Sequence, residues 1–278
     1  WLTKLVSDID LAYIAGYYNM GDMAGTISGS FTYFSMGAVQ LVDYSGTAFQ
    51  EAHPNEWAID VAYSRKLHEY VSMAVALRFL YSDLNNGVNA SVSGASQEMH
   101  PAWTMAADVA LYYKQPISLP MGESYFGLGF NLSNLGGKMT YDDYVSNFIP
   151  ANMRLGVSYE IPFDNYNRLM ATVECNKMLV PTYYSNKASD QTTHRYSQEE
   201  YSAISSTAGW FQSFADAPGY INETTGKTVS SSLEEFQEVQ WGVGLEYSYN
   251  RQFFGRVGYS HENFYKGNRR YVTLGAGF

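Results

Sequence analysis

The sequence predicts an all-β fold, a transmembrane antiparallel β-barrel of the outer membrane, from three observations. Only 16% of the 278 residues are charged and 16% are aromatic, whereas ordinary soluble domains carry about 25% charged residues. Apolar side chains recur at every second position over long runs, which is the period of a β-strand. Short and long connections alternate along the chain, as they do in outer-membrane barrels.

Each expected strand alternates apolar side chains with Gly, Ala, Ser or charged residues. In chain order, the apolar positions of the clearest runs are Trp57, Ile59, Val61 and Tyr63; Val71, Met73, Val75, Leu77 and Phe79; Met105, Ala107, Val109 and Leu111; Phe126, Leu128 and Phe130; Met153, Leu155, Val157, Tyr159 and Ile161; Trp241, Val243, Leu245, Tyr247 and Tyr249; and Val272, Leu274, Ala276 and Phe278. We therefore expect one face of each strand to meet lipid, and we count eleven strands in all.

The connections predict two different ends of the barrel. Short turns lie near 21–25, 67–70, 116–123, 163–167 and 250–252, and long loops lie near 37–55, 83–101, 135–151, 180–237 and 262–268. All short turns therefore fall at one end of the sheet and all long loops at the other. This asymmetry is typical of barrels with tight periplasmic turns and extended extracellular loops.

The strand rhythm continues through both halves of the chain, so we expect one barrel domain over residues 1–278. Residues 180–237 form its long extracellular loop, in which Ser197 and Glu200 predict a capping box that opens a short helix within 197–216. The chain opens at Trp1 without an initiating Met and ends in YVTLGAGF, which is typical of an unfinished strand. Both ends of a longer protein are therefore expected to be missing.

Aromatic placement separates a membrane barrel from a soluble sandwich or a lipocalin-like barrel, in which residues would also alternate. On strands that run from a long loop to a short turn, Trp is often the first residue of the apolar face and Tyr lies near the turn. The members of these two belts are Trp57, Trp103 and Trp241, and Tyr63, Tyr113 and Tyr247. Two belts at opposite ends of the apolar face match the two lipid–water interfaces of a membrane.

The inward face of the expected barrel carries charges of both signs. They are Asp60, Arg78, Asp108, Arg154, Glu160, Glu246 and Arg256. These side chains could line a pore that selects small solutes, or they could form ion pairs that fill a narrow lumen. Because unpaired like charges in a narrow lumen are costly, we favour ion pairs across strands.

Several function classes find no support in the residues. The chain has no GxSxG elbow, no HExxH, no complete GxxxxGK[ST] phosphate-binding loop and no Cys pair. Its five His are scattered, so no metal site and no cofactor are expected. With 27 acidic against 17 basic residues, a nucleic-acid partner is disfavoured. Cys175, on the apolar phase, is expected to be a small hydrophobic residue.

Apolar residues on the long loops need a covering surface. They are Phe148 and Ile149 in SNFIPAN; Trp210, Phe211 and Phe214 in GWFQSFADAPG; and Tyr141 and Tyr144 in TYDDY. They could fold over the barrel mouth as a lid, or they could form a surface that binds a partner. Both roles are compatible with the sequence.

Stretches across nearly the whole chain resemble the PorV family of the type IX secretion system, in the wider FadL-like barrel group. The stretches are DIDLAYIAGYYNMGD, GTISGSFTYFSMG, NEWAIDVAYSRKL, SMAVALRFLYSDL, NFIPANMRLGVSYE, NKMLVPT, GWFQSFADAPG and GNRRYVTLGAGF. NEWAIDVAYSRKL, FIPANMRLG and FADAPG are the most specific. Segments around 184–205 and 219–232 depart from the family as insertions.

The resemblance implies a barrel of about 14 strands, or one strand before residue 1 and two after residue 278 beside the eleven counted here. It implies no enzymatic activity. It implies an integral outer-membrane protein, in a bilayer with lipopolysaccharide, that takes cargo by a C-terminal signal domain from the translocon barrel. The cargo then passes to an attachment complex with a sortase-like subunit at the cell surface. The loops would be the working surface.

Two other function classes stay open. FadL-like transport of a hydrophobic small molecule would need an apolar lumen, and the inward faces are small and polar. A lipid-modifying hydrolase of the outer membrane would need a Ser, a His and a carboxylate brought together from separate strands.

Overall fold

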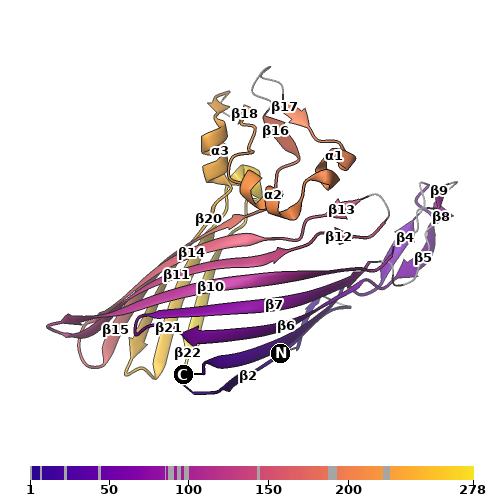
Figure 1. The fold of residues 1–278 in the computed structure, drawn as a ribbon. Helices are drawn as coiled ribbons and strands as arrows, with labels where there is room; N and C mark the ends of the chain where they lie inside the picture. Colours follow the sequence, from indigo (N-terminus) through magenta and orange to yellow (C-terminus); the bar gives the residue numbers. More distant parts are fainter. Residues whose placement is uncertain are drawn as a thin grey trace.

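The fold is one large antiparallel sheet that curves on itself, with three short helices over one end (Figure 1). It is seen in a computed structural model. The residues it describes are 2–6, 8–21, 24–42, 45–84, 86, 91–92, 95–96, 100–142, 145–186, 193–221 and 226–278.

The sheet has 12 strands, and each pairs with its neighbours along the chain. They are β1 (Leu2–Val6), β2 (Ile9–Asn19), β3 (Thr26–Ser35), β6 (Asn55–Lys66), β7 (Val71–Asp83), β10 (Ala102–Leu119), β11 (Gly122–Gly136), β14 (Asn152–Pro162), β15 (Asn167–Met178), β20 (Gln240–Tyr249), β21 (Phe253–His261) and β22 (Arg270–Gly277). Within the described residues, β1 and β22 are the two edges of the sheet. An antiparallel barrel-type sheet was predicted, and the all-β class is confirmed.

The count of eleven strands is wrong by one, because β1 was not expected. Its sequence, LTKLV, has no clean alternation, since Lys4 interrupts the apolar phase of Leu2 and Val6. Backbone pairing with β2 forms the strand despite this pattern.

The outer face of the sheet is apolar and exposed. Members of the predicted lipid-facing set are exposed by 40% or more, including Leu155, Val157, Ile59, Val61, Val243 and Leu245. An aromatic ladder crosses this face near the long-loop end, where Trp57 stacks on Tyr81 at 5.1 Å and Phe79 stacks on Trp103 at 5.9 Å. Such a face is stable only where lipid replaces water.

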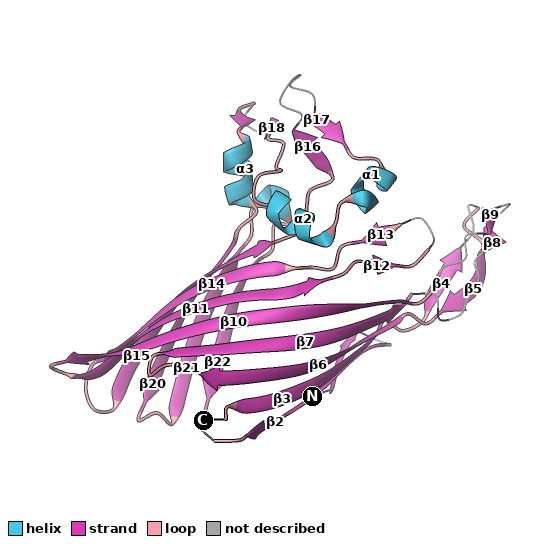
Figure 2. Ribbon diagram, viewed as in Figure 1, coloured by secondary structure: helices cyan, strands magenta, loops and turns pink. Residues whose placement is uncertain are grey.

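The long connections contain structure of their own (Figure 2). They hold β4 (Val39–Val42), β5 (Ala48–Ala52), β8 (Ser91–Val92), β9 (Ala95–Ser96), β12 (Met139–Thr140), β13 (Ser146–Asn147), β16 (Tyr184–Asn186), β17 (Thr193–Arg195), α1 (Gln198–Ala203), α2 (Ser206–Gln212), β18 (Tyr220–Ile221), β19 (Thr228–Val229), α3 (Ser231–Gln237) and η1 (Phe264–Lys266). We call residues 179–239, between β15 and β20, the cap. No helix in the described part of the chain is both long enough and apolar enough to span a bilayer.

The predicted capping box is present, because Ser197 Oγ accepts from Glu200 N at 3.2 Å and Glu200 Oε2 accepts from Ser197 N at 2.9 Å. The helix within 197–216 is two helices rather than one. Helix α1 ends at Ala203, and Ser205 caps α2 through Ala208 N at 3.2 Å.

Candidate functional site

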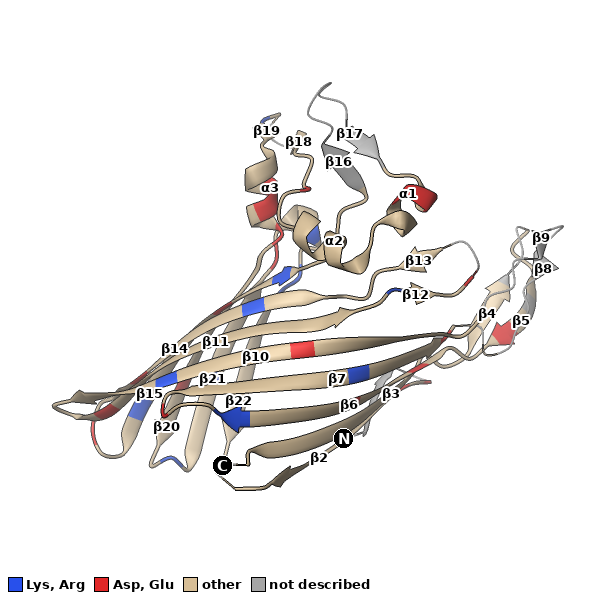
Figure 3. Ribbon diagram, viewed as in Figure 1, with Lys and Arg blue, Asp and Glu red and all other residues tan. Residues whose placement is uncertain are grey.

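Charged side chains are sparse on the strands (Figure 3), and the inward ones pair across neighbouring strands. Arg78 on β7 lies 2.5 Å from Asp60 on β6 and 3.2 Å from Asp108 on β10. Ser30 on β3 donates to Asp60 at 2.9 Å, and the backbone N–H of Asn134 on β11 donates to Asp108 at 2.7 Å. The polar network around this one cation therefore spans five adjacent strands, including its own.

The other inward charges pair more locally. Glu160 lies 2.6 Å from Arg168, and Glu246 lies 2.5 Å from Arg256. Arg168 was not singled out from the sequence, although Glu160 and Arg168 lie on the two strands that the short turn 163–167 joins. Among the described residues Arg154 has no ion pair, and it lines a cavity of about 550 Å³ together with Arg78, Asp108 and Glu174.

A second cavity, of about 420 Å³, lies between the strand ends and the connection from β11 to β14. Asp60, Arg78 and Glu56 line its polar side, and Ile149 lines its apolar side. Tyr141 donates to Ser82 Oγ at 2.9 Å, and Ser82 donates to Glu56 at 2.8 Å. These hydrogen bonds join a serine to a carboxylate and a phenol. Nowhere in the described ranges do three or more His, Cys, Asp or Glu gather as metal ligands would.

The cap has an aromatic core around Tyr201, which is 7% exposed. Its ring stacks on Tyr183 at 4.0 Å and meets Phe148 edge-on at 5.3 Å. Its hydroxyl donates to Pro181 O at 2.8 Å, and burial raises the pKa of Tyr201 to about 12. Tyr201 was not singled out from the sequence, because its neighbours come from three separate segments.

The predicted partner-binding residues divide between this core and the surface. Ile149 is only 6% exposed. Phe148 packs against α2 at Gly209, where an added Cβ would lie 2.8 Å from the Phe148 ring. Neither residue therefore forms an exposed patch, because Phe148 packs on the cap and Ile149 lines the cavity at the strand ends.

On the surface, Phe211 is 78% exposed and Phe214 is 45% exposed. Trp210, which also belongs to α2, is half-buried. Tyr141 is half-buried against the inner face, and Tyr144 lies outside the described residues. Phe211 and Phe214 are thus the predicted binding residues that stay accessible in the structure.

Two lysines fasten the cap to the barrel through α3. Lys177, at the end of β15, lies 3.0 Å from Glu235 and 2.8 Å from Glu238. Lys266, in η1, lies 2.6 Å from Glu234 and 2.9 Å from Glu238. Lys177 is 6% exposed, so this ion cluster is shielded from water. Helix α3 was not predicted, because the sequence analysis placed its residues in the long loop 180–237.

Asp216 of the FADAPG loop lies beside this cluster and is 6% exposed. One carboxylate oxygen accepts from Thr182 N at 2.7 Å, and the other, Oδ1, is buried without a hydrogen-bond partner among the described residues. The pKa of Asp216 is raised to about 6, mainly by burial; the charges of Glu235 and Glu238 also raise it, whereas the hydrogen bond from Thr182 N and the charge of Lys177 lower it.

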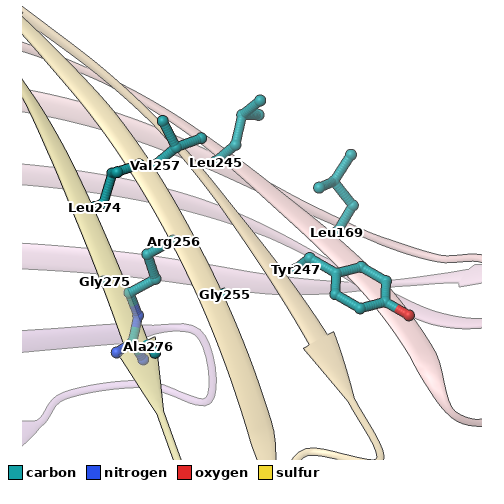
Figure 4. A pocket seen from close by; sticks show the side chains of 9 residues that line it. All are labelled: Leu169, Leu245, Tyr247, Gly255, Arg256, Val257, Leu274, Gly275 and Ala276. Atoms are coloured by element: carbon teal, nitrogen blue, oxygen red, sulfur yellow. The ribbon is translucent and has the colours of Figure 1, made fainter.

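A shallow groove of about 660 Å³ crosses β20, β21 and β22 on the outer face. Leu245, Val257 and Leu169 rise on one side of the strands, whereas the Arg256 side chain runs toward β22 (Figure 4). A Cβ added at Gly277 would lie 3.2 Å from Arg256 Nη1, so glycine leaves room for the guanidinium. The apolar part of this groove belongs to the lipid-facing surface.

Comparison with known proteins finds a family that matches the N-terminal two thirds of the chain. Residues 1–185 match the family described as type IX secretion system protein PorV. No curated protein matches the chain significantly. Among solved structures, LpxR from Salmonella typhimurium aligns over 97% of this chain and 88% of its own, with 10% sequence identity and a TM-score of 0.41.

Proposed function

The chain belongs to the PorV family of type IX secretion system proteins, and from this we propose that it binds secreted cargo by the cargo's C-terminal signal domain. Family membership places it in type IX protein secretion at the outer membrane. We propose further that it receives cargo from the translocon barrel and passes it to the surface attachment complex, which contains a sortase-like subunit.

The accessible aromatic pair of the cap supports this proposal. Phe211 and Phe214 are exposed on a cap that two lysines hold to the barrel, so their position relative to the membrane is fixed. Exposed aromatic residues on a rigid support are typical of protein-binding surfaces, and each can contribute on the order of 2 kcal/mol when a partner buries it. We place the cap and the other long connections on the cell-surface side of the membrane.

We propose neither catalysis nor small-molecule transport for the barrel itself. The inner face is polar and crossed by the Arg78 ion network, so it does not favour FadL-like passage of a hydrophobic molecule. Ser82 on the inner face forms hydrogen bonds with Glu56 and Tyr141, and we assign it a structural role.

Replacing Phe211 and Phe214 together by Ser tests the proposal. The double variant should insert and remain heat-modifiable, because the strands are untouched, but it should bind a purified cargo signal domain about a thousandfold more weakly if each ring contributes about 2 kcal/mol. The measurement is a pull-down or titration with immobilised signal domain.

Ile221→Ser is the matched control, because Ile221 is a similarly exposed apolar side chain, at 67%, elsewhere on the cap. It should bind signal domain normally. If the Phe211/Phe214 variant also binds normally and supports surface attachment, cargo binding by this part of the cap is excluded. Co-purification with the translocon then tells whether the pair serves translocon contact instead.

A further inference from the structure

Helix α3 turns its charged side inward and its apolar side outward, the reverse of a helix packed on a protein in water. Glu234 is 7% exposed, whereas Leu233 is 49% exposed and Phe236 is 59% exposed. Figure 1 shows α3 above the start of β20, at the side of the cap rather than over its centre. The cap therefore leaves the apolar side of α3 uncovered.

Hydrogen bonds and ion pairs fix this orientation. Glu234 accepts from Gly219 N at 2.6 Å and from Lys266 at 2.6 Å. Glu235 accepts from Ala217 N at 2.6 Å and from Lys177 at 3.0 Å. Rotating the helix to bury its apolar side would leave these carboxylates and lysines unpaired, which is costly for shielded charges.

The apolar side of α3 continues the lipid-facing surface of the barrel. The Phe236 ring lies 5.7 Å from the ring of Trp241. Trp241 is the second residue of β20, is 36% exposed, and shares the outer face with Val243 and Leu245. Trp at the end of a lipid-facing strand marks the lipid–water interface, and α3 ends only three residues before β20 begins.

Basic and aromatic side chains complete the same end of the barrel. Trp241, His261 and Arg270 form one cross-strand row over β20, β21 and β22. Phe264 in η1 is 61% exposed, and the Arg269 side chain is 71% exposed while it binds Glu262 at 2.7 Å. Arginines at this level can reach anionic lipid headgroups, and exposed rings can enter the headgroup region.

We propose that Leu233 and Phe236 of α3, with Trp241 and Phe264, form a membrane-docking surface that sits in the headgroup region at the long-loop end of the barrel. In the orientation proposed above this is the outer leaflet. The occupant of the surface is the lipid–water interface itself, because the surface is continuous with the lipid-facing wall. The docking holds the cap at a fixed height and tilt over the membrane.

Spin labels test this directly. In a Cys175→Ser background, single cysteines replace Leu233, Phe236 and, as the matched control, Glu199, which is exposed on α1. The labelled full chain is reconstituted in vesicles of phosphatidylcholine and phosphatidylglycerol, and collision with oxygen and with a water-soluble nickel chelate is measured. Labels at 233 and 236 should show a higher oxygen-to-nickel accessibility ratio than the label at 199.

Equal ratios at all three positions would overturn the proposal. Labels that are open to nickel in vesicles, and become shielded only when purified translocon is added, would also overturn it in favour of a protein contact. Heat-modifiability of each labelled chain shows that the barrel is folded. Because the vesicles contain no cargo, this result is independent of whether Phe211 and Phe214 capture signal domains.

Discussion

Arg78 is the residue on which the inner face depends most. Its guanidinium serves Asp60 and Asp108, which come from the strands on either side, and it also binds Asn134. The side chains of the two acids and of Arg78 are between 17% and 23% exposed. Without the arginine, two shielded carboxylates would face each other without a cation.

Arg78→Met should therefore destabilise the barrel by about 3 kcal/mol, at the low end for breaking a buried ion network. The measurement is the urea midpoint of the heat-modifiable form. Arg256→Gln is the control, because Arg256 is 51% exposed and forms its ion pair with Glu246; its loss should cost less than about 1 kcal/mol. Adding Asp60→Asn and Asp108→Asn to Arg78→Met should restore part of the stability, and no recovery would argue against the electrostatic explanation.

Asp216 should make the cap sensitive to pH. Its pKa is raised from 3.8 to about 6 in the folded cap, so the folded state binds its proton more tightly than the unfolded state. Ionised Asp216 therefore disfavours the folded cap above about pH 6, and stability is gained as pH falls from about 6 to about 4, by roughly 3 kcal/mol in total.

Asp216→Asn should remove this dependence and make the cap more resistant to protease at pH 7.5. Limited proteolysis of residues 179–239 at pH 4.5 and pH 7.5 measures both effects. Glu199→Gln, an exposed acid on the same cap, should keep the wild-type pH profile. A cap that is equally resistant at both pH values in the wild type would contradict the prediction.

At the scale of elements, the strands were predictable because lipid imposes a strict rule on every second residue. Leu155, Val157 and their equivalents must be apolar wherever the wall meets lipid, and the period therefore survives in the sequence. Strand β1 escaped because Lys4 breaks that period. The general prediction of ion pairs across strands followed from the same alternation, and Asp60 and Arg78 are register partners on the inward phase of adjacent strands.

The cap could not be predicted to the same depth, because its contacts join segments far apart in the chain. Tyr201 packs between Phe148 and Tyr183, and Asp216 is held by Thr182 N. Only its local signals were readable, such as the capping box of Ser197 and Glu200. The sequence left open whether Phe148 and Ile149 cover the barrel mouth or bind a partner, because it cannot show that an apolar loop residue such as Ile149, at 6% exposed, is covered by its own chain.

Strand β14 provides a test of the lipid-facing assignment. Leu155 is 40% exposed on its outer face, and Leu155→Arg should lower the free energy of unfolding in lipid by roughly 2–4 kcal/mol if the site lies near the midplane. Urea unfolding in vesicles measures the loss. Tyr249→Arg, at the end of β20, should cost only about 0–1 kcal/mol because it lies near an interface. Equal costs at the two sites would place the membrane elsewhere on the sheet.

At the scale of the whole molecule, Lys177 joins the barrel to the cap. Lys177→Met would leave Glu235 and Glu238 with one cation fewer in a shielded site, so the cap should become easier to open by about 3 kcal/mol. Protease should cut residues 179–239 faster while the barrel stays heat-modifiable. The control variant Lys227→Met changes an exposed position of the same cap. Protease should cut it at the wild-type rate. Unchanged cutting in the Lys177 variant would show that the ion cluster is not what fastens the cap.

The position of the cap between β15 and β20 also bears on how the protein folds. Most neighbouring strands of the sheet are joined by short turns or by self-contained hairpins, so their pairing is local and fast. Pairing β15 with β20 must close residues 179–239 into a loop, which costs about 2 kcal/mol more than closing about five residues. A cap that has already folded brings Met178 and Gln240 close together and removes much of that cost. The last three strands should therefore join the sheet only after the cap has formed, and a destabilised cap should slow the assembly of the barrel before it weakens the finished one.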